Sequence, residues 1–260
     1  MKRNVCVAKC GMFALACLFF VSVNAQEKEY PKAEAMKPGM SEFWTPQPPV
    51  VQPGNDYTIT APSDAIVLFD GTNLNAWKSS GKDGGEAKWT VKDGAFTVAP
   101  RTGDIETKQH FNSFQLHIEW ASPTEVKGTS QGRGNSGIFL QGMYELQVLD
   151  CYDNETYSNG QTGSIYKQAR PLVNAMRKPG EWNVYDVIYE APTFKEDGTY
   201  RTNPTVTVIQ NGVVLQNHTT IIGTTEYIGF PKVVPHGAGP IKLQDHGNLV
   251  SFRNVWIREL

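Results

Sequence analysis

The stretch GRGNSGIFLQGMYELQVLD, residues 132–150, decides the fold class of this chain. Its first six letters match G-x-G-x-x-G, the glycine pattern of dinucleotide-binding loops. That pattern binds a pyrophosphate where a strand enters the loop and a helix leaves it. Here a polar loop precedes the glycines, and the residues after them alternate as two short strands around Gly142. The stretch therefore predicts a β-hairpin rather than a dinucleotide site.

Alternation with a period of two continues through most of the chain after residue 65, and it indicates strands. In residues 114–120, FQLHIEW, apolar and polar side chains strictly alternate. Two hairpins are expected, one around residues 92–94 and one at Asn211-Gly212, a strong two-residue turn signal. Helical periodicity is nearly absent. Roughly a dozen short strands joined by Gly, Asn, Asp and Pro turns predict an all-β, two-sheet antiparallel sandwich.

The chain divides into three parts on composition. Residues 1–25 have the pattern of a secretory signal peptide, basic and then apolar, with cleavage after Ala25 favoured over lipidation at Cys17. Residues 26–63 form a Pro-rich N-terminal arm. Residues 64–260 are uniform and predict a single β-sandwich domain. No later apolar run is long enough for a transmembrane segment, so we expect an exported protein, periplasmic or at the cell surface of a bacterium.

Charge and cysteine content narrow the range of partners. Loss of the signal leaves 21 of the 24 basic residues against 26 acidic ones, a net charge of about −5. A mildly acidic chain without Lys/Arg runs is a poor nucleic-acid binder, and no specific protein partner is evident. Cys151 alone remains after cleavage. We expect it to be a small buried hydrophobe rather than a nucleophile.

Several strands and loops carry polar groups of the kind that bind sugars. Glu145 and Gln147 lie on one face of a predicted strand, and residues two apart in a strand are about 7 Å apart. Carboxylates, amides, imidazoles and aromatic rings elsewhere complete a candidate carbohydrate site: His117, Glu119, Arg133, Asn135, Asp150, Tyr166, Lys167, His236, Gln244, Asp245 and His246. The simpler alternative is that such residues form the water-facing side of each sheet.

Motifs of other catalytic classes are absent from the sequence. The five histidines are scattered without zinc-ligand spacing, and no H-E-x-x-H motif occurs. There is no G-x-S-x-G elbow and no P-loop. No cofactor is certain on these grounds.

Five stretches together resemble the 3-keto-disaccharide hydrolase family: LFDGTNLNAW, GDIETKQHFNSFQLHIEW, GRGNSGIFLQGMYELQVLD, GQTGSIYKQARPLVNAMRKPGEWNVYDV and KLQDHGNLVSFRNVWIREL. The resemblance covers roughly residues 64–260. It implies a concanavalin A-like jelly roll of the lectin/glucanase type, and a 3-keto-glycoside as the carbohydrate substrate. It also implies that the glycine loop leads into a strand of the sugar cleft, with Arg133 and Asn135 aimed at substrate oxygens.

A ketone at C3 of a sugar acidifies the hydrogen at C2, so a single base can form an enolate and expel the group at C1 by β-elimination, after which water adds. We assign Glu145 as this base, with His117 or His236 as the alternatives. Arg133 or Lys167 would stabilise the enolate. A divalent metal is an alternative stabiliser, with Glu119, Glu145 or Asp150 as oxygen ligands.

The remaining candidates have a positioning role. Gln147, Asn135 and Asp150 would orient the substrate hydroxyls. Ordinary double displacement needs two carboxyl groups about 5 to 5.5 Å apart, and the strand around Glu145 offers an amide and a leucine where a second carboxylate would fall. Two rivals stay open: a conventional glycoside hydrolase of unoxidised glycans, and a non-catalytic carbohydrate-binding module.

Overall fold

A computed structural model describes residues 34–51 and 60–260, so the predicted signal peptide and part of the arm lie outside the described residues. The described chain contains fifteen strands and three short 3₁₀ helices. The strands are β1 (Ile66–Phe69), β2 (Trp77–Ser79), β3 (Thr90–Lys92), β4 (Ala95–Thr97), β5 (Ile105–Thr107), β6 (Phe114–Ala121), β7 (Ser136–Leu140), β8 (Tyr144–Val148), β9 (Asn183–Glu190), β10 (Thr193–Phe194), β11 (Tyr200–Thr202), β12 (Thr205–Gln210), β13 (Val213–Thr220), β14 (Lys242–Leu243) and β15 (Ser251–Glu259). The helices are η1 (Pro38–Ser41), η2 (Ser130–Gly132) and η3 (Ser158–Gly160).

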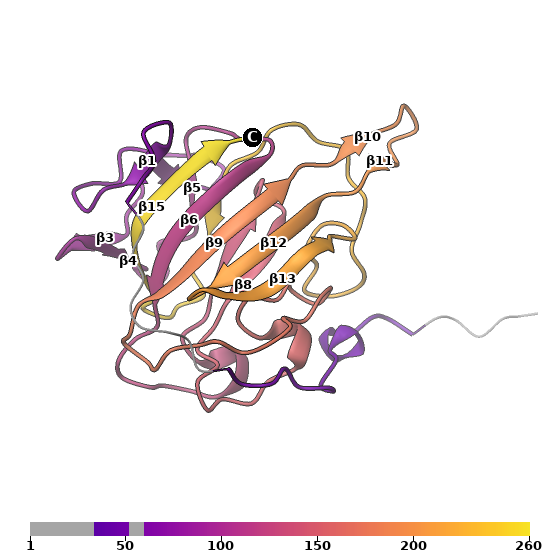
Figure 1. Cartoon of the computed structure of the whole chain (residues 1–260), viewed down its shortest axis with the longest axis horizontal. Coiled ribbons are helices and arrows are strands. Elements are labelled where there is room, and N and C mark those ends of the chain that lie inside the picture. The colour runs from indigo at the N-terminus through magenta and orange to yellow at the C-terminus, as the bar shows by residue number, and fades with distance from the viewer. Residues whose placement is uncertain (1–33, 52–59) are drawn as a thin grey trace, which may run out of the picture. The chain divides into compact units, whose positions relative to one another are not determined.

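The strands form two main antiparallel sheets packed as a sandwich, as the sequence predicts. The large sheet has eight strands in the order β13-β12-β9-β6-β15-β4-β3, with β1 also paired to β15. The small sheet has five strands in the order β2-β5-β14-β7-β8. Figure 1 shows the large sheet running diagonally across the view, with β5 and β8 of the small sheet behind it. Strands β10 and β11 form a separate hairpin.

The core lies between the two sheets and is built from the apolar half of each alternating strand. From β6 it takes Leu116 and Ile118, and from β8 it takes Tyr144 and Leu146, all at most 1% exposed. Because side chains alternate across a strand, the residues between them must lie on the outer face of each sheet. The predicted apolar face of residues 114–120 is thus confirmed.

Turn chemistry sets the registers of the hairpins. Asn211 and Gly212 both adopt positive φ, 53° and 80°, between β12 and β13, as a type I′ turn requires. Asp93 and Gly94 do the same between β3 and β4. The hairpin predicted around Gly142 is also present, joining β7 to β8 through a cross-strand register in which Gly137 pairs with Gln147.

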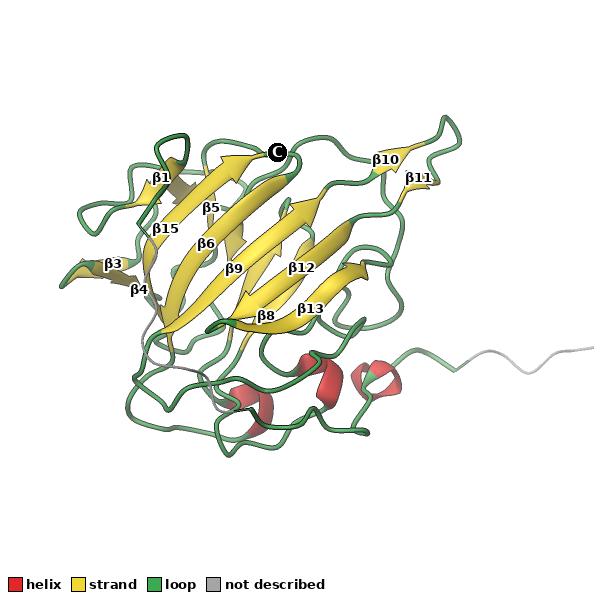
Figure 2. Ribbon diagram, in the orientation of Figure 1, coloured by secondary structure: helices red, strands yellow, loops and turns green. Residues whose placement is uncertain are grey.

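The three short helices gather at one edge of the view in Figure 2, and η1 belongs to the N-terminal arm. Two backbone hydrogen bonds tie the later part of the arm to the domain: Val51 N–H donates to the Asn174 carbonyl, and Asn174 N–H donates to the Pro49 carbonyl, each over 2.8 Å. Across the described ranges, no helix is both long and apolar enough to cross a membrane.

Candidate active site

A cleft of about 730 Å³ lies on the outer face of the small sheet, a volume within the usual range of ligand sites. Strands β7 and β8 supply part of its lining, loops supply more, and the arm supplies the rest. The lining residues are Glu42, Trp44, Ser130, Gln131, Gly132, Asn135, Phe139, Glu145, Gln147, Tyr157, Tyr166, Thr225, Tyr227, Gln244 and His246.

Glu145 is the acidic residue that strand β8 contributes to the cleft. It is 5% exposed and forms no ion pair with any residue in the described part of the chain. Burial raises the pKa of its carboxyl to about 8, against a smaller opposing effect of the Lys242 charge. A carboxyl whose pKa lies near neutral pH is matched to proton transfer in either direction.

The glycine loop makes room for this carboxyl. A Cβ on Gly137 would stand 2.6 Å from Oε1 of Glu145, closer than real Cβ atoms approach. Gly134 adopts a φ of 54°, and a Cβ there would stand 3.0 Å from both Asp150 and Ser122. Gly137, the third glycine of the loop, therefore leaves room for the Glu145 carboxylate on the neighbouring strand, and this is a physical reason for glycine at this position.

A pair of tyrosines stands beside Glu145. The hydroxyl groups of Tyr157 and Tyr166 are 2.6 Å apart. Burial raises the pKa of Tyr166 to about 12, and the nearby charges of Glu145 and Glu42 add to the rise. Both phenols therefore stay protonated at neutral pH. One hydroxyl donates to the other, which leaves one O–H of the pair to donate into the cleft.

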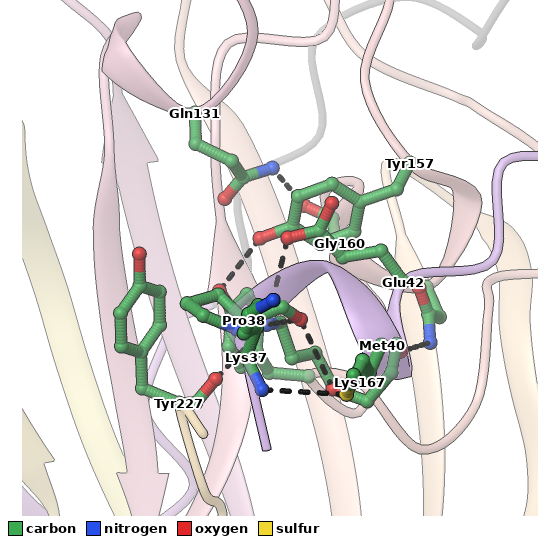
Figure 3. A network of polar contacts seen from close by, with 12 residues as sticks. Lys37, Pro38, Met40, Glu42, Gln131, Tyr157, Gly160, Lys167 and Tyr227 are labelled. Carbon is green, nitrogen blue, oxygen red and sulfur yellow. Dashed lines mark hydrogen bonds and ion pairs between the residues drawn. The ribbon is translucent and has the colours of Figure 1, made fainter. Parts of the chain in front are cut away.

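Lys167 links the arm to the loop that carries Tyr227, as Figure 3 shows. Its Nζ donates to the Pro38 carbonyl over 2.9 Å and to the Tyr227 carbonyl over 3.0 Å, and lies 3.6 Å from Oε1 of Glu42. Burial lowers the pKa of Lys167, while Glu42 acts in the opposite direction. The ammonium group is thus used in holding the arm.

Five of the other predicted site residues line the same cleft: Asn135, Gln147, Tyr166, Gln244 and His246. The hydrogen bonds around Gln147 are satisfied when its amide nitrogen points toward Glu145. In this orientation the nitrogen donates to Oε1 of Glu145 over 3.2 Å. The Nδ2 of Asn135 donates to the Gln131 carbonyl over 2.7 Å. Their roles toward a substrate stay predictions.

Arg133 and Asp150 lie in a different place. They line a second cavity of about 360 Å³ between loops, and Nε of Arg133 donates to Oδ2 of Asp150 over 2.7 Å. Arg133 also donates to the Tyr152 carbonyl over 2.8 Å. The structure does not bring this guanidinium to the cleft, because the buried Asp150 carboxylate holds it on the other side of the glycine loop.

His117 and Glu119 lie on the outer face of the large sheet, so two layers of strands separate them from Glu145. Both are fully buried, which neither the water-facing nor the substrate-binding interpretation predicts. His117 Nδ1 is 2.7 Å from Oδ1 of Asp186, and Arg253 Nε donates to Glu119 over 2.6 Å. The imidazole of His117 and the carboxylate of Glu119 are thus occupied by contacts with Asp186 and Arg253 on this outer face.

Two further candidates are also placed outside the cleft lining. His236 Nε2 is 2.7 Å from the hydroxyl of Tyr144, a core residue. Asp245 accepts hydrogen bonds from Gly103 N–H over 3.1 Å and from Gly247 N–H over 2.9 Å. Both side chains therefore contact other parts of the protein outside the cleft, although His246 and Gln244 on either side of Asp245 reach the cleft.

The predicted metal ligands do not come together. Glu145, Glu119 and Asp150 occupy three separate places, and no three His, Cys, Asp or Glu side chains among the described residues are grouped to hold an ion. Cys151 is 3% exposed, and burial raises the pKa of its thiol to about 12. The prediction of an inert buried cysteine agrees with this environment.

Sequence reasoning missed several residues of the cleft. Glu42 and Trp44 come from the arm, Tyr157 comes from the loop before η3, and Tyr227 comes from the loop after β13. The adjacent aromatic residues Phe43 and Trp44 within the Pro-rich arm are the sequence signal that could have pointed to the arm. Nothing local marks Tyr157 or Tyr227, since loop residues reach a site only through the fold.

Comparison with known proteins gives the class and the family. A provisionally assigned glycosyl hydrolase of Parabacteroides distasonis is 72% identical, with a TM-score of 0.77 over 85% of this chain and 95% of its own. A second from the same organism is 24% identical with a TM-score of 0.55, over 76% of this chain and 94% of its own, and shows the shared fold. A 3-keto-disaccharide hydrolase of Bacteroides thetaiotaomicron is 28% identical over 252 residues, which cover 78% of this chain and 82% of that protein.

The fold, the cleft and these relatives define an enzyme of the β-sandwich glycoside hydrolase class. Residues 64–258 match the 3-keto-alpha-glucoside-1,2-lyase-like domain. The chain belongs to that family, which confirms the resemblance found in the sequence.

Proposed function

We propose that this enzyme cleaves the glycosidic bond of 3-keto-glycosides by removing the proton at C2 and eliminating the group at C1, after which water adds. The observation that carries the proposal is Glu145, a buried carboxyl without an ion-pair partner, set in the cleft of a chain from this family. The name of the Bacteroides thetaiotaomicron relative supports the choice of substrate.

The chemistry balances with one base and one proton donor. Ionised Glu145 takes the proton from C2, and the electron pair forms the enolate whose negative charge lies on the C3 oxygen. The enolate then re-forms the ketone, makes a C1–C2 double bond and expels the oxygen at C1, which takes a proton. Addition of water across the double bond restores a 3-keto sugar. A pKa near 8 suits a base that must both accept and return a proton.

Neutral hydrogen-bond donors, rather than the predicted cations, surround Glu145 in the cleft. Arg133 is held by Asp150 and Lys167 by the arm, so we assign the oxygens of the substrate to other groups. The Tyr157–Tyr166 hydroxyl pair would donate to the leaving oxygen or to the enolate, and the amides of Gln131 and Gln147 would hold hydroxyls.

The test is turnover of a 3-keto-glucoside beside its unoxidised parent, with and without a chelator. We expect cleavage of the keto form alone, with deuterium at C2 exchanged or lost during turnover. Full retention of that deuterium would rule out the elimination step. Binding of sugar without turnover of either substrate would instead identify a binding module.

A conventional glycoside hydrolase is the second candidate, because Glu42 gives the cleft a second carboxylate. In that case Glu145 would act as the general acid, a role for which a raised pKa is also suited. Rapid turnover of the unoxidised glycoside would establish it.

We also propose that the enzyme is exported, on the strength of the signal pattern in residues 1–25. The mature protein recovered from the periplasm or cell surface would then begin at Gln26. Recovery of a chain that still carries residues 1–25, or of a lipid on Cys17, would contradict cleavage after Ala25.

A further inference from the structure

The N-terminal arm is held against the cleft by buried polar side chains. Asn159, 1% exposed, donates from Nδ2 to the Ser41 carbonyl over 3.1 Å and accepts from Phe43 N–H over 3.0 Å. Ser158 donates to the Phe43 carbonyl from both its N–H and its hydroxyl, each over 2.6 Å. The backbone on both sides of Glu42 is thereby fixed, so the arm presents its side chains in one geometry.

One of those side chains is a large aromatic ring at the cleft. Trp44 is 47% exposed although it lines the cleft, and its ring packs against Tyr157 at 6.1 Å with a 66° interplanar angle. A ligand that covers exposed indole surface at a binding cleft removes apolar surface from water, which favours binding. The C–H face of a sugar ring is an apolar surface of suitable size.

A second exposed ring lies at the same cleft, on a loop that is tied to the arm. Tyr227 is 64% exposed, and the ammonium of Lys167 lies 4.9 Å from its ring centroid. Lys167 donates to the carbonyls of both Pro38 and Tyr227, so one buried cation joins the arm to the loop that carries Tyr227 (Figure 3). The two rings are therefore positioned together.

The two exposed rings lie nearer to solvent than the carboxyl of Glu145, which is buried in the cleft. Glu145 is 5% exposed, whereas Trp44 and Tyr227 are about half exposed or more. A sugar that reacts at Glu145 must sit deep, and the unit attached to its C1 must extend toward solvent and the exposed rings. We propose that Trp44 and Tyr227 are stacking platforms for the leaving-group sugar. The arm precedes the matched family domain, which spans residues 64–258, so a segment outside that domain sets the preference for the leaving group.

This inference rests on the proposed function, and the test keeps the two apart. Turnover is measured with a 3-keto-disaccharide and with methyl 3-keto-glucoside, which lacks a sugar leaving group. Trp44→Ala should raise KM for the disaccharide about tenfold, and should change KM for the methyl glycoside less than twofold. Trp44→Phe, which keeps an aromatic face, should recover most of the loss, and Tyr227→Ala should resemble Trp44→Ala.

Phe43→Ala is the matched control. Phe43 is the neighbouring aromatic residue of the arm and is 59% exposed, but it is not part of the cleft lining. Its replacement should leave both KM values unchanged. Equal effects of Phe43→Ala and Trp44→Ala, or equal effects of Trp44→Ala on the two substrates, would overturn the platform assignment.

If the wild-type enzyme turns over neither keto substrate, the proposed function fails, and the platform is judged by binding alone. Calorimetric titration with an unoxidised disaccharide then replaces turnover for the same variants. A Kd raised about tenfold by Trp44→Ala and unchanged by Phe43→Ala supports the platform, and an unchanged Kd for both variants overturns it. If Trp44→Ala is unfolded by circular dichroism, Tyr227→Ala and Trp44→Phe decide the question in the same way.

Discussion

The two outer faces of the sandwich each bury a glutamate, and the two glutamates differ in their partners. Glu119, on the large sheet, contacts the His117 imidazole, the Asn254 amide and the Arg253 guanidinium. Burial raises the pKa of its carboxyl, but these three contacts outweigh burial and hold it below the usual value. Glu145, on the small sheet, has no cation at contact distance in the described part of the chain, and burial raises its pKa to about 8. An alternating strand produces both positions, so the neighbouring strands and loops decide which carboxyl is available for proton transfer.

The largest expected effect is on kcat, and it should differ between substitutions of the two glutamates. Glu145→Gln should lower kcat on a 3-keto-glycoside by about 10² to 10⁴-fold, because the amide cannot accept the C2 proton. Glu119→Gln, the matched control on the other face, should retain the kcat of the folded enzyme. Single-turnover and steady-state rates, corrected for the folded fraction, measure the difference. Full activity of Glu145→Gln would show that another group is the base.

A smaller loss is expected from filling the space beside Glu145. Gly137→Ala puts a methyl group where the carboxylate now lies, and a displacement of about 1 Å can lower a rate by up to about a hundredfold. Gly237→Ala is the control, since a Cβ there meets no atom within 4 Å and φ is not in the left-handed region. If the two variants have the same kcat, the fit between Gly137 and the carboxylate is unimportant for the reaction.

The pH dependence of the rate tests the raised pKa directly. If ionised Glu145 is the base, kcat/KM should rise about tenfold per pH unit below its pKa of about 8 and then level off. A general acid would give the opposite sign, with activity falling above the same pKa. The rate profile of the 3-keto substrate between roughly pH 5 and pH 10 therefore distinguishes the elimination from conventional hydrolysis.

The effect of pH on stability differs in sign between the two faces. The pKa of Glu145 is higher in the folded protein than in the unfolded chain. The free energy of unfolding therefore falls as pH rises from 4.5 toward 8, by about 1.4 kcal/mol per pH unit. The folded pKa of Glu119 is depressed, so it stabilises the fold above its unfolded pKa and loses this effect as pH falls.

Melting temperatures at several pH values measure this contrast. Glu145→Gln should raise Tm at pH 8 relative to wild type, and should have little effect near pH 4. Glu119→Gln should lower Tm at pH 7, and the loss should shrink on acidification. The same sign for both variants at pH 8 would contradict the assigned environments.

The sequence by itself determined the class of fold, the hairpins and the location of Glu145 on a strand, because alternation and turn residues are local properties. Asn211-Gly212 favours the positive φ values of a type I′ turn, and the alternation in residues 114–120 places their apolar side chains on one face. The stretches that carry the family resemblance are equally local. They led to the correct family without any contact information.

Only the tertiary structure decided which polar residues share a site. His117 and Glu145 carry the same local signature, but the core between the two sheets puts them on opposite faces. Arg133 and Asn135 are two residues apart, yet Asp150 holds the first in a second cavity while the second lines the cleft. Trp44 and Tyr227, 183 positions apart, meet at one cleft through the buried Lys167. Such groupings depend on which strands pair and which loops cross them, and no local pattern encodes that.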